Sequence, residues 1–427
     1  MKTSKLIPLS ALAALFQLVP SPAPAQQGQS PQHPVLVIQE GDTIPGTGRR
    51  TVDYLSGPVN AGGDNVGVIA VLSGDEEGAL WIGHHRLGQR DLILAHEVGA
   101  LQFVPNRFGA VAEALWGGYD ELRTDFALKA VMKDGGLALL TSWGVAQRFG
   151  ESATGLPEGA VVTGIDRIQM LLNGQTYWVA NWQAPGLSGN AFFRRQAGPG
   201  AETELLMNRG DPVCGGELQY LRHFRMSQDQ RHGHVLDLDT DTGSRRALYI
   251  DGQCPYAVGE PFPGSGERPT EFWFFDLNRF GRVLFGAITD ASSSRNAVMA
   301  LDGKVVMREG EVIDGVYLAP PHAEPNEIRL DDRGRAVTLW ANSAGLHYSI
   351  FYTPDVDQIG DTRELVSENT PLDLDGDGVD DATLHRFRFF VNSGPTFSLG
   401  DTGIYIAVLL RYAGSDEPVS AIIFYPF

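Results

Sequence analysis

The sequence predicts an all-β protein, a seven-bladed β-propeller with four antiparallel strands in each blade. Two observations predict this fold. A short pattern recurs seven times along the chain at intervals of about 40–60 residues, a spacing typical of repeat architectures. In addition, the first strand expected after the N-terminal leader supplies the one strand that the last repeat lacks.

The clearest copy of the repeat contains the turn Asn278-Arg279-Phe280-Gly281, with an apolar strand expected before it at Phe272–Asp276. The copy ends at Gly310-Glu311. Four short strands of this kind make one propeller blade. The three strands expected after the turn are Val283–Ala287, Ala297–Leu301 and Val305–Arg308. The turn glycines of the seven copies are Gly67, Gly109, Gly174, Gly233, Gly281, Gly334 and Gly403.

The last repeat is incomplete. It offers strands at Arg386–Val391, Ile404–Leu410 and Val419–Phe424, and no fourth strand follows. An isolated strand with the features of a fourth one, Val35–Glu40, stands near the start of the chain and is followed by Gly41-Asp42. We therefore expect the N-terminal strand to complete the seventh blade and close the ring, which removes exposed sheet edges. The alternative, an open β-solenoid, would not explain why the two ends complement each other.

The first 25 residues are expected to be a cleaved signal peptide. Lys2 and Lys5 give a positive start, Leu6–Val19 is apolar, and Ala23-Pro24-Ala25 is a cleavage site of small residues. A membrane anchor is the alternative, but the apolar stretch is short and interrupted by polar residues. Residues 26–33 are expected to be a disordered lead-in, and residues 34–427 a single propeller domain. The protein is expected to be periplasmic or secreted, with no membrane span after the leader.

The acidic composition excludes some partners. The formal net charge is −19, and such a surface repels phosphate backbones and anionic lipid. Nucleic acid is therefore not an expected partner.

The chain has two cysteines, Cys214 and Cys254, which lie beside the outer-strand turns of consecutive repeats. Disulfides persist in the oxidising compartments to which a signal peptide leads. We expect a disulfide bond between neighbouring repeats; two free thiols are the alternative.

Two motifs carry a resemblance to a known family. Asn278-Arg279-Phe280-Gly281-Arg282-Val283-Leu284-Phe285 and the loop Gly41-Asp42-Thr43-Ile44-Pro45-Gly46 resemble the exported tandem-repeat proteins named for an NxxGxxxF motif. The resemblance covers nearly all of the chain after the leader. It implies propeller-like repeats and no defined activity.

Acidic residues that follow the fourth strands are expected on one rim of the ring. They could form a ligand-binding face for cations or polar glycans. The simpler interpretation, which we favour, is that each acidic side chain caps its own tight turn. The recurring members are Asp42, Asp211, Glu260 and Glu311.

The strongest metal motif is an acidic loop in the sixth connection between repeats. Calcium prefers six to eight oxygen ligands, and carboxylates at alternate loop positions can surround one ion. Leu384 stands where an EF-hand has its last glutamate, so only a simpler structural calcium loop is expected. A solvated acidic turn is the alternative. The expected ligands are Asp373, Asp375, Asp377, the carbonyl of Val379, and Asp381.

No catalytic residue is predicted, because the sequence has no nucleophile elbow, no zinc-protease motif and no phosphate-binding loop. Two functions fit the sequence. The first is an exported, non-catalytic binding protein that holds a protein or glycan through one face. The alternative is a glycoside hydrolase or polysaccharide lyase with carboxylates in the central channel. The sequence does not name the ligand.

Overall fold

The computed structural model describes residues 33–427, except for 44–50, 60–64, 74–76, 85–88, 98–99, 102–110, 121–124, 133–134, 321–324, 344–346 and 389–394. These residues belong to one compact unit, Pro31–Phe427. The predicted signal peptide and all but the last residue of the predicted lead-in lie outside the described residues.

The described residues are almost entirely β-structure, with one short 3-10 helix at Val356–Asp361. Seven sheets within them have four or more strands each, and all of their pairings are antiparallel. No helix of the described residues is long and apolar enough to cross a membrane.

The first three sheets follow the chain in order. The first is β2 (Val52–Leu55), β3 (Asn65–Leu72), β4 (Glu77–His84), β5 (Gln89–Glu97) and β6 (Ala100–Leu101). The second is β7 (Val111–Asp120), β8 (Asp125–Met132), β9 (Leu137–Thr141) and β10 (Gly144–Arg148). The third is β11 (Val161–Met170), β12 (Thr176–Ala184), β13 (Leu187–Arg195) and β14 (Thr203–Asn208).

The next three sheets are built in the same way. The fourth is β15 (Pro212–Val213), β16 (Gly216–Met226), β17 (His232–Thr240), β18 (Gly243–Ile250) and β19 (Gln253–Ala257). The fifth is β20 (Pro269–Leu277), β21 (Val283–Thr289), β22 (Ala297–Leu301) and β23 (Lys304–Arg308), followed by the hairpin β24 (Val312–Ile313) and β25 (Val316–Tyr317). The sixth is β26 (Pro325–Leu330), β27 (Ala336–Ser343), β28 (His347–Thr353) and β29 (Arg363–Ser367).

The last sheet combines the two ends of the chain. It contains β30 (Pro371–Leu372), β31 (Ala382–Phe387), β32 (Phe397–Leu399), β33 (Gly403–Tyr412), β34 (Val419–Pro426) and β1 (Val35–Gln39). Strand β1 pairs antiparallel with β34, from Val35 opposite Phe424 to Gln39 opposite Ala421. The N-terminal strand therefore pairs with the strand that the sequence predicts for it.

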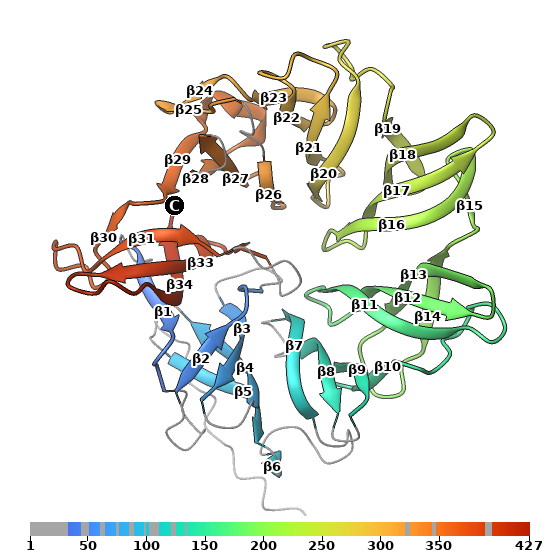
Figure 1. Ribbon diagram of the computed structural model, residues 1–427, viewed down its shortest axis with the longest axis horizontal. Helices are drawn as coiled ribbons and strands as arrows, with labels where there is room; N and C mark the ends of the chain where they lie inside the picture. Colours follow the sequence, from blue (N-terminus) through green and yellow to red (C-terminus); the bar gives the residue numbers. More distant parts are fainter. Residues whose placement is uncertain are drawn as a thin grey trace, which may run out of the picture. The chain divides into compact units, whose positions relative to one another are not determined.

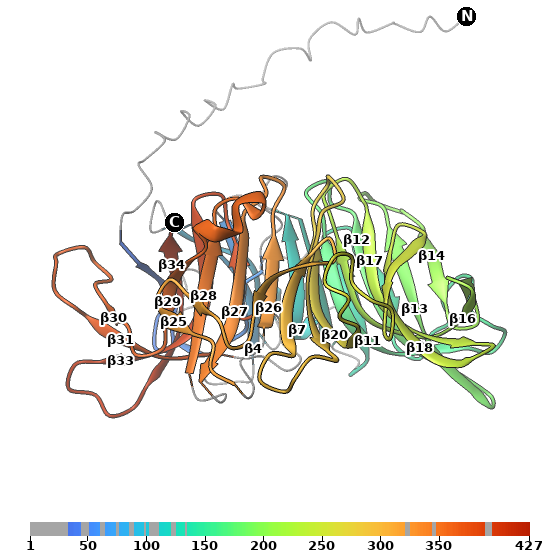
Figure 2. The same cartoon turned by 90° about the horizontal axis from the view of Figure 1, so that it is seen from above.

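The sheets follow one another around a common middle, which is the arrangement of a β-propeller (Figure 1). We call β7, β11, β16, β20 and β26 the inner strands, because they lie nearest the middle in this view. Strands β20 and β26 belong to consecutive sheets and make extensive contacts, and they stand side by side in both views (Figure 2).

The core consists of hydrophobic clusters, each held between two sheets that follow one another. Trp178 and Trp182 of β12 are buried between the second and third sheets, and Trp340 of β27 lies between the fifth and sixth. These tryptophans are packing residues, as their places in apolar strands predict. One cluster joins the two ends of the chain, since Val37 and Ile38 pack with residues of β2, β3, β33 and β34.

Four of the turns after an inner strand share one geometry. In each, the first residue bonds to the fifth, and the fourth residue has a positive φ. Glycine adopts this conformation at little cost, which explains the glycine of the repeat. The first and fourth residues of the turns are Leu171 and Gly174, Ser227 and Gln230, Asn278 and Gly281, and Asp331 and Gly334.

Three of the predicted turn glycines are not turn residues. Gly67, Gly233 and Gly403 lie in β3, β17 and β33, and Gly109 is outside the described residues. Gly233 is explained by packing, because a Cβ there would meet the ring of Phe275 at 2.7 Å. The turn residue of that repeat is Gln230, three positions earlier.

Shortening Ile38 to alanine tests the packing of the N-terminal strand. Ile38 is fully buried in the cluster that joins the two ends of the chain. We expect Ile38→Ala to lower the free energy of unfolding by about 2–5 kcal/mol, measured from the midpoint of urea unfolding, because a buried cavity replaces three carbons. Val312→Ala, at a side chain that is 61% exposed, is the control and should change it by less than about 0.5 kcal/mol. If Ile38→Ala and wild type have the same midpoint of urea unfolding, the packing of Ile38 between the two ends of the chain is contradicted.

Candidate functional site

The Gly-Asp motif of the rim is a structural connection between consecutive sheets. The glycine N–H donates to the carbonyl of a residue in the following segment. The N–H of that second residue donates back to the carbonyl of the acidic residue. In the first copy these bonds join Gly41 and Asp42 to Val52, each at 2.8 Å. The glycines all have φ between +82° and +93°, which other residues rarely adopt. The copies with both bonds are Gly41-Asp42, Gly150-Glu151, Gly210-Asp211 and Gly310-Glu311.

The side chains of the predicted rim face serve mainly these turns. Asp42 accepts a hydrogen bond from the N–H of Gln39, and Asp211 accepts one from the N–H of Asn208. Glu260 forms an ion pair with Arg245 at 2.5 Å. Among the described residues, no group of acidic side chains with metal-ligand spacing includes any of these three or Glu311. Asp42 and Asp211 therefore cap their turns, whereas Glu260 pairs with an arginine of the preceding sheet.

The acidic loop between β30 and β31 gathers three of the expected metal ligands. One carboxylate oxygen each of Asp373, Asp375 and Asp377 lies within 4.8 Å of the others. Asp381 is not in this group, since its Oδ2 accepts the N–H of Leu374. The loop projects from the unit beyond β30 and β31 (Figure 2).

Backbone N–H groups already order this loop. Asp373 accepts the N–H of Gly376 at 2.6 Å and that of Gly378 at 2.8 Å. Although desolvation acts in the opposite direction, these bonds and the nearby His33 lower the pKa of Asp373. Backbone hydrogen bonds thus support the conformation of the loop, and carboxylate oxygens are the ligands that calcium prefers.

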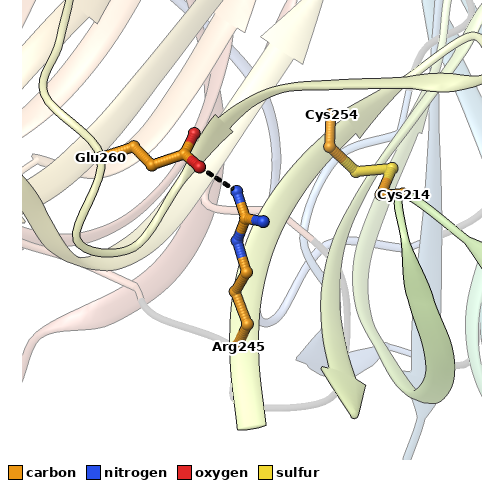
Figure 3. The surroundings of a disulfide bond; sticks show 4 residues. All are labelled: Cys214, Arg245, Cys254 and Glu260. Carbon is orange, nitrogen blue, oxygen red and sulfur yellow. Dashed lines mark hydrogen bonds and ion pairs between the residues drawn. A yellow bond between two sulfur atoms is a disulfide. The ribbon is translucent and has the colours of Figure 1, made fainter. Parts of the chain in front are cut away.

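The predicted disulfide is present between Cys214 and Cys254, with the Cα atoms 5.9 Å apart (Figure 3). Its position differs from the expectation of a bond between two repeats. Cys214 lies in the turn between β15 and β16, and Cys254 lies in β19, which belongs to the same sheet. The segment after Gly210-Asp211 folds back on β16, so the bond ties the connection arriving from β14 to the outer strand of the following sheet.

Three inner strands and the adjoining β17 and β18 carry a group of polar and aromatic side chains that we call the inner-strand patch. Its exposed members come from β11, β16 and β20. Arg222 and Arg246 share the carboxylate of Asp237, at 2.7 and 2.8 Å, and Arg222 lies over the ring of Tyr220. These interactions fix the side chains in place. The patch consists of Asp166, Tyr220, Arg222, Asp237, Arg246 and Glu271.

Beside this patch lies a more buried set of charges. Asp276 and Glu327 are 8% and 7% exposed, and three half-buried arginines interact with them or with one another. We call Arg167, Arg225 and Arg329 the arginine cluster.

Three of these five residues, Arg225, Asp276 and Arg329, occupy one position of the repeat. Each stands five residues before the turn residue with positive φ, and Gln169 has the same place in β11. The position links neighbouring inner strands. The amide of Gln169 bonds to the N–H and carbonyl of Met226 in β16, and Asp276 accepts the N–H of Leu330 in β26.

Within the described part of the chain, the hydrogen bonds of this set leave Arg225 without a carboxylate partner. Glu327 accepts from Arg329 at 2.5 Å and from the N–H of Thr396. Asp276 accepts only the N–H groups of Leu277 and Leu330 among the described residues. Arg225 donates to the carbonyl of Phe224 at 3.4 Å. Its buried Nε has no hydrogen-bond partner among the residues that the structure describes.

Burial and neighbouring charges shift the pKa values of two residues in this set. Burial, followed by the neighbouring Arg329, lowers the pKa of Arg225 to about 9, so that it remains a cation at neutral pH. Burial and then Arg167, Arg225, Arg222 and Arg246 lower the pKa of His223 to about 2. His223 is therefore neutral at neutral pH. The three arginines of the cluster stand with three carboxylates, Asp166, Asp276 and Glu327.

Comparison with known proteins adds a likeness of fold. Neither the protein-family models nor the curated proteins contain a match. Among solved structures, the oligogalacturonate lyase of Vibrio parahaemolyticus is 9% identical with a TM-score of 0.49, covering 92% of this chain and 97% of its own. The polysaccharide lyase Uly1 is 9% identical with a TM-score of 0.44, covering 92% and 98%. The Dos1 propeller is 9% identical with a TM-score of 0.35, covering 90% and 80%. None of these likenesses indicates a function for this chain.

Removing the disulfide tests its contribution to stability. The two cysteines are 40 positions apart, and the loop-closure model gives about 4 kcal/mol for a link of that length. We expect Cys214→Ser with Cys254→Ser to lower the free energy of unfolding by about 2–4 kcal/mol in urea. Wild-type protein in reductant should behave like the double variant. If the double variant has the same midpoint of urea unfolding as the oxidised wild type, the prediction is wrong.

Proposed function

We propose that the protein is an exported, non-catalytic propeller that binds a protein or glycan through one face. The observation that carries the proposal is the inner-strand patch. Ion pairs hold Arg222 and Glu271, Arg222 lies over the ring of Tyr220, which is 40% exposed, and the members come from consecutive sheets. Preorganised polar and aromatic groups of this kind are typical of ligand sites.

The proposal includes a closed ring of seven blades, of the NxxGxxxF repeat type. The pairing of β1 with β34 and the hydrophobic cluster between the last and first sheets support closure. Export is supported by the leader-like composition of residues 1–25 and by the disulfide, since disulfides persist in oxidising compartments.

The enzyme alternative requires carboxylates that are available to a substrate. Asp276 and Glu327, the buried carboxylates of the inner strands, are occupied by backbone N–H groups and by Arg329. Both therefore have a structural role in the geometry described. These two carboxylates are thus not available to a substrate, whereas Asp166 and Glu271 of the inner-strand patch are exposed.

A glycan array and a panel of exported proteins test the binding proposal. Tyr220→Ala should weaken binding of the ligand so found by about tenfold or more, because truncating a central aromatic contact costs roughly 2 kcal/mol. The control is Tyr317→Ala, on the hairpin of β24 and β25, where the side chain is 51% exposed. Absence of any ligand, or equal losses for the two variants, would contradict the proposal.

We also propose that the loop between β30 and β31 holds a structural calcium ion. Asp373, Asp375 and Asp377 would supply carboxylate oxygens, with the Val379 carbonyl and Asp381 completing the shell. Mutual repulsion of the three grouped carboxylates supports the proposal, because a divalent ion relieves it.

Melting temperatures with calcium and with chelator test this site. Binding to the folded state alone adds about 2.7 kcal/mol when free calcium is a hundred times its dissociation constant. We expect chelator to lower the melting temperature of wild type but not of Asp375→Ala. Asp241→Ala, outside the loop, should retain the response. Identical melting of wild type with and without calcium would exclude the site.

A further inference from the structure

We propose that His232 and His234 form a proton-sensitive joint between the third and fourth sheets, which acid loosens. We call these two residues the histidine pair; both lie on β17. The inference goes beyond the proposed function and does not rest on it, because it concerns the contact between two sheets and not a ligand. Its test is therefore independent of whether any ligand binds.

The two imidazole rings share one hydrogen bond. Nδ1 of His232 and Nε2 of His234 are 3.0 Å apart, so one of these nitrogens donates and the other accepts. His234 is fully buried, whereas His232 is half-buried. The other ring nitrogen of His234, Nδ1, is buried and has no hydrogen-bond partner among the residues that the structure describes.

The histidine pair lies in the contact between the third and fourth sheets. The ring of Phe192, on β13 of the third sheet, is centred 4.5 Å from the ring of His234 and 5.8 Å from that of His232. Within the fourth sheet, Phe224 and Tyr249 stand opposite His234 on the neighbouring strands. A change in the charge of the pair therefore acts directly on the packing between these two sheets.

Two side-chain amides tie the same two sheets together. Asn190 of β13, which is fully buried, accepts the N–H of Leu221 in β16 at 3.0 Å. Gln169 of β11 accepts the N–H of Met226 in β16 at 3.0 Å, and Met226 stands opposite His232. Because neither amide side chain titrates, the N–H groups of Leu221 and Met226 report whether the sheets remain in contact.

A third hydrogen on the histidine pair disturbs this contact. In the neutral pair each ring carries one hydrogen, and one of the two is shared between the rings. After an added proton, either two N–H groups face each other and the hydrogen bond is lost, or Nδ1 of His234 becomes a buried N–H without an acceptor. Both outcomes cost free energy, in addition to the cost of burying a charge.

The charged groups around His232 do not offset this cost. Burial lowers the pKa of His232, and Arg194 of β13 adds to the lowering. Asp251, which accepts the backbone N–H of His232 at 2.9 Å, acts in the opposite direction. The carboxylate of Asp251 is also paired with Arg231, which in turn pairs with Asp229.

The surroundings of His234 are less favourable still to a charge. Burial, followed by the neighbouring His232, lowers the pKa of His234 well below its usual value. Phe192 and Phe224 present apolar rings to it. Burial raises the pKa of Tyr249, so this neighbour on β18 is a neutral phenol.

The direction of the pH dependence follows from the lowered pKa values. In an opened joint a histidine takes up a proton near its usual pKa of about 6.5, whereas in the closed joint it stays neutral. The closed form is therefore fully favoured above about pH 6.5 and loses stability as the pH falls below that value. The loss reaches about tenfold in the equilibrium constant for each pH unit and each histidine.

Native-state hydrogen exchange, followed by NMR from about pH 7 to about pH 5, tests the proposal. The protection factors of the Leu221 and Met226 amides should fall by up to about tenfold per histidine for each pH unit below about 6.5. The amide of Thr289, which bonds to the carbonyl of Asn296 in the fifth sheet, is the internal control and should keep its protection.

His234→Phe removes the buried titrating group and keeps an aromatic ring in its place. The protection of Leu221 and Met226 should then lose most of its pH dependence. His223→Phe is the matched control. His223 is also a histidine whose pKa burial lowers, to about 2, but its ring is centred 5.6 Å from that of Phe274 in the fifth sheet. Its replacement should leave the pH dependence at Leu221 and Met226 unchanged.

Three results would overturn the inference. They are protection of Leu221 and Met226 that stays constant below about pH 6.5, equal effects of the two variants, and a parallel loss at Thr289, which would mean that the whole protein unfolds. If His234→Phe does not fold, the ring-carbon chemical shifts of His234 in the wild type take its place. They should show protonation of His234 at the pH at which protection is lost, and a ring that stays neutral there would exclude the proposal.

Discussion

Burial between neighbouring sheets is the interaction on which this structure depends. A single four-stranded sheet has two apolar faces and cannot cover either of them alone. Each sheet here is covered on both sides by the sheets that precede and follow it, through clusters such as the one around Trp178 and Trp182. Because the faces are used for packing, only the strand edges, the turns and the inner strands remain free to carry binding groups.

That constraint explains why the same glycine and acidic residues recur. The connection from an outer strand to the next inner strand must reverse direction within a few residues, and a glycine with positive φ makes the reversal possible. The acidic residue beside it contributes its carbonyl, and at Asp42 and Asp211 also its carboxylate, to the turn. A motif repeated around the rim is here a requirement of chain geometry rather than of a ligand.

The sequence predicted strands and turns correctly where a repeat keeps its glycine in the turn. It was misleading where another residue takes the place of that glycine. It predicted the strands, the pairing of Val35–Gln39 with the last strand, and the disulfide. It did not reveal the arginine cluster, because the turn of the fourth repeat was aligned on Gly233. Gln230 takes the place of glycine in that turn. When Gln230 is aligned with the turn glycines of the other repeats, Arg225 falls at the same position as Asp276 and Arg329. The burial of these side chains cannot be read from their spacing alone.

The pairing of β1 with β34 has a consequence for the order of events during synthesis. The hydrogen bond between the N–H of Ser420 and the carboxylate of Glu40 spans 380 positions, so the strand at Glu40 must wait for a partner that is synthesised much later. Contacts of such separation form slowly, because a long loop must close before they contribute. Until then the edge of β34 is open to other chains. Synthesis of the chain therefore has a vulnerable interval, which ends only when β1 covers this edge.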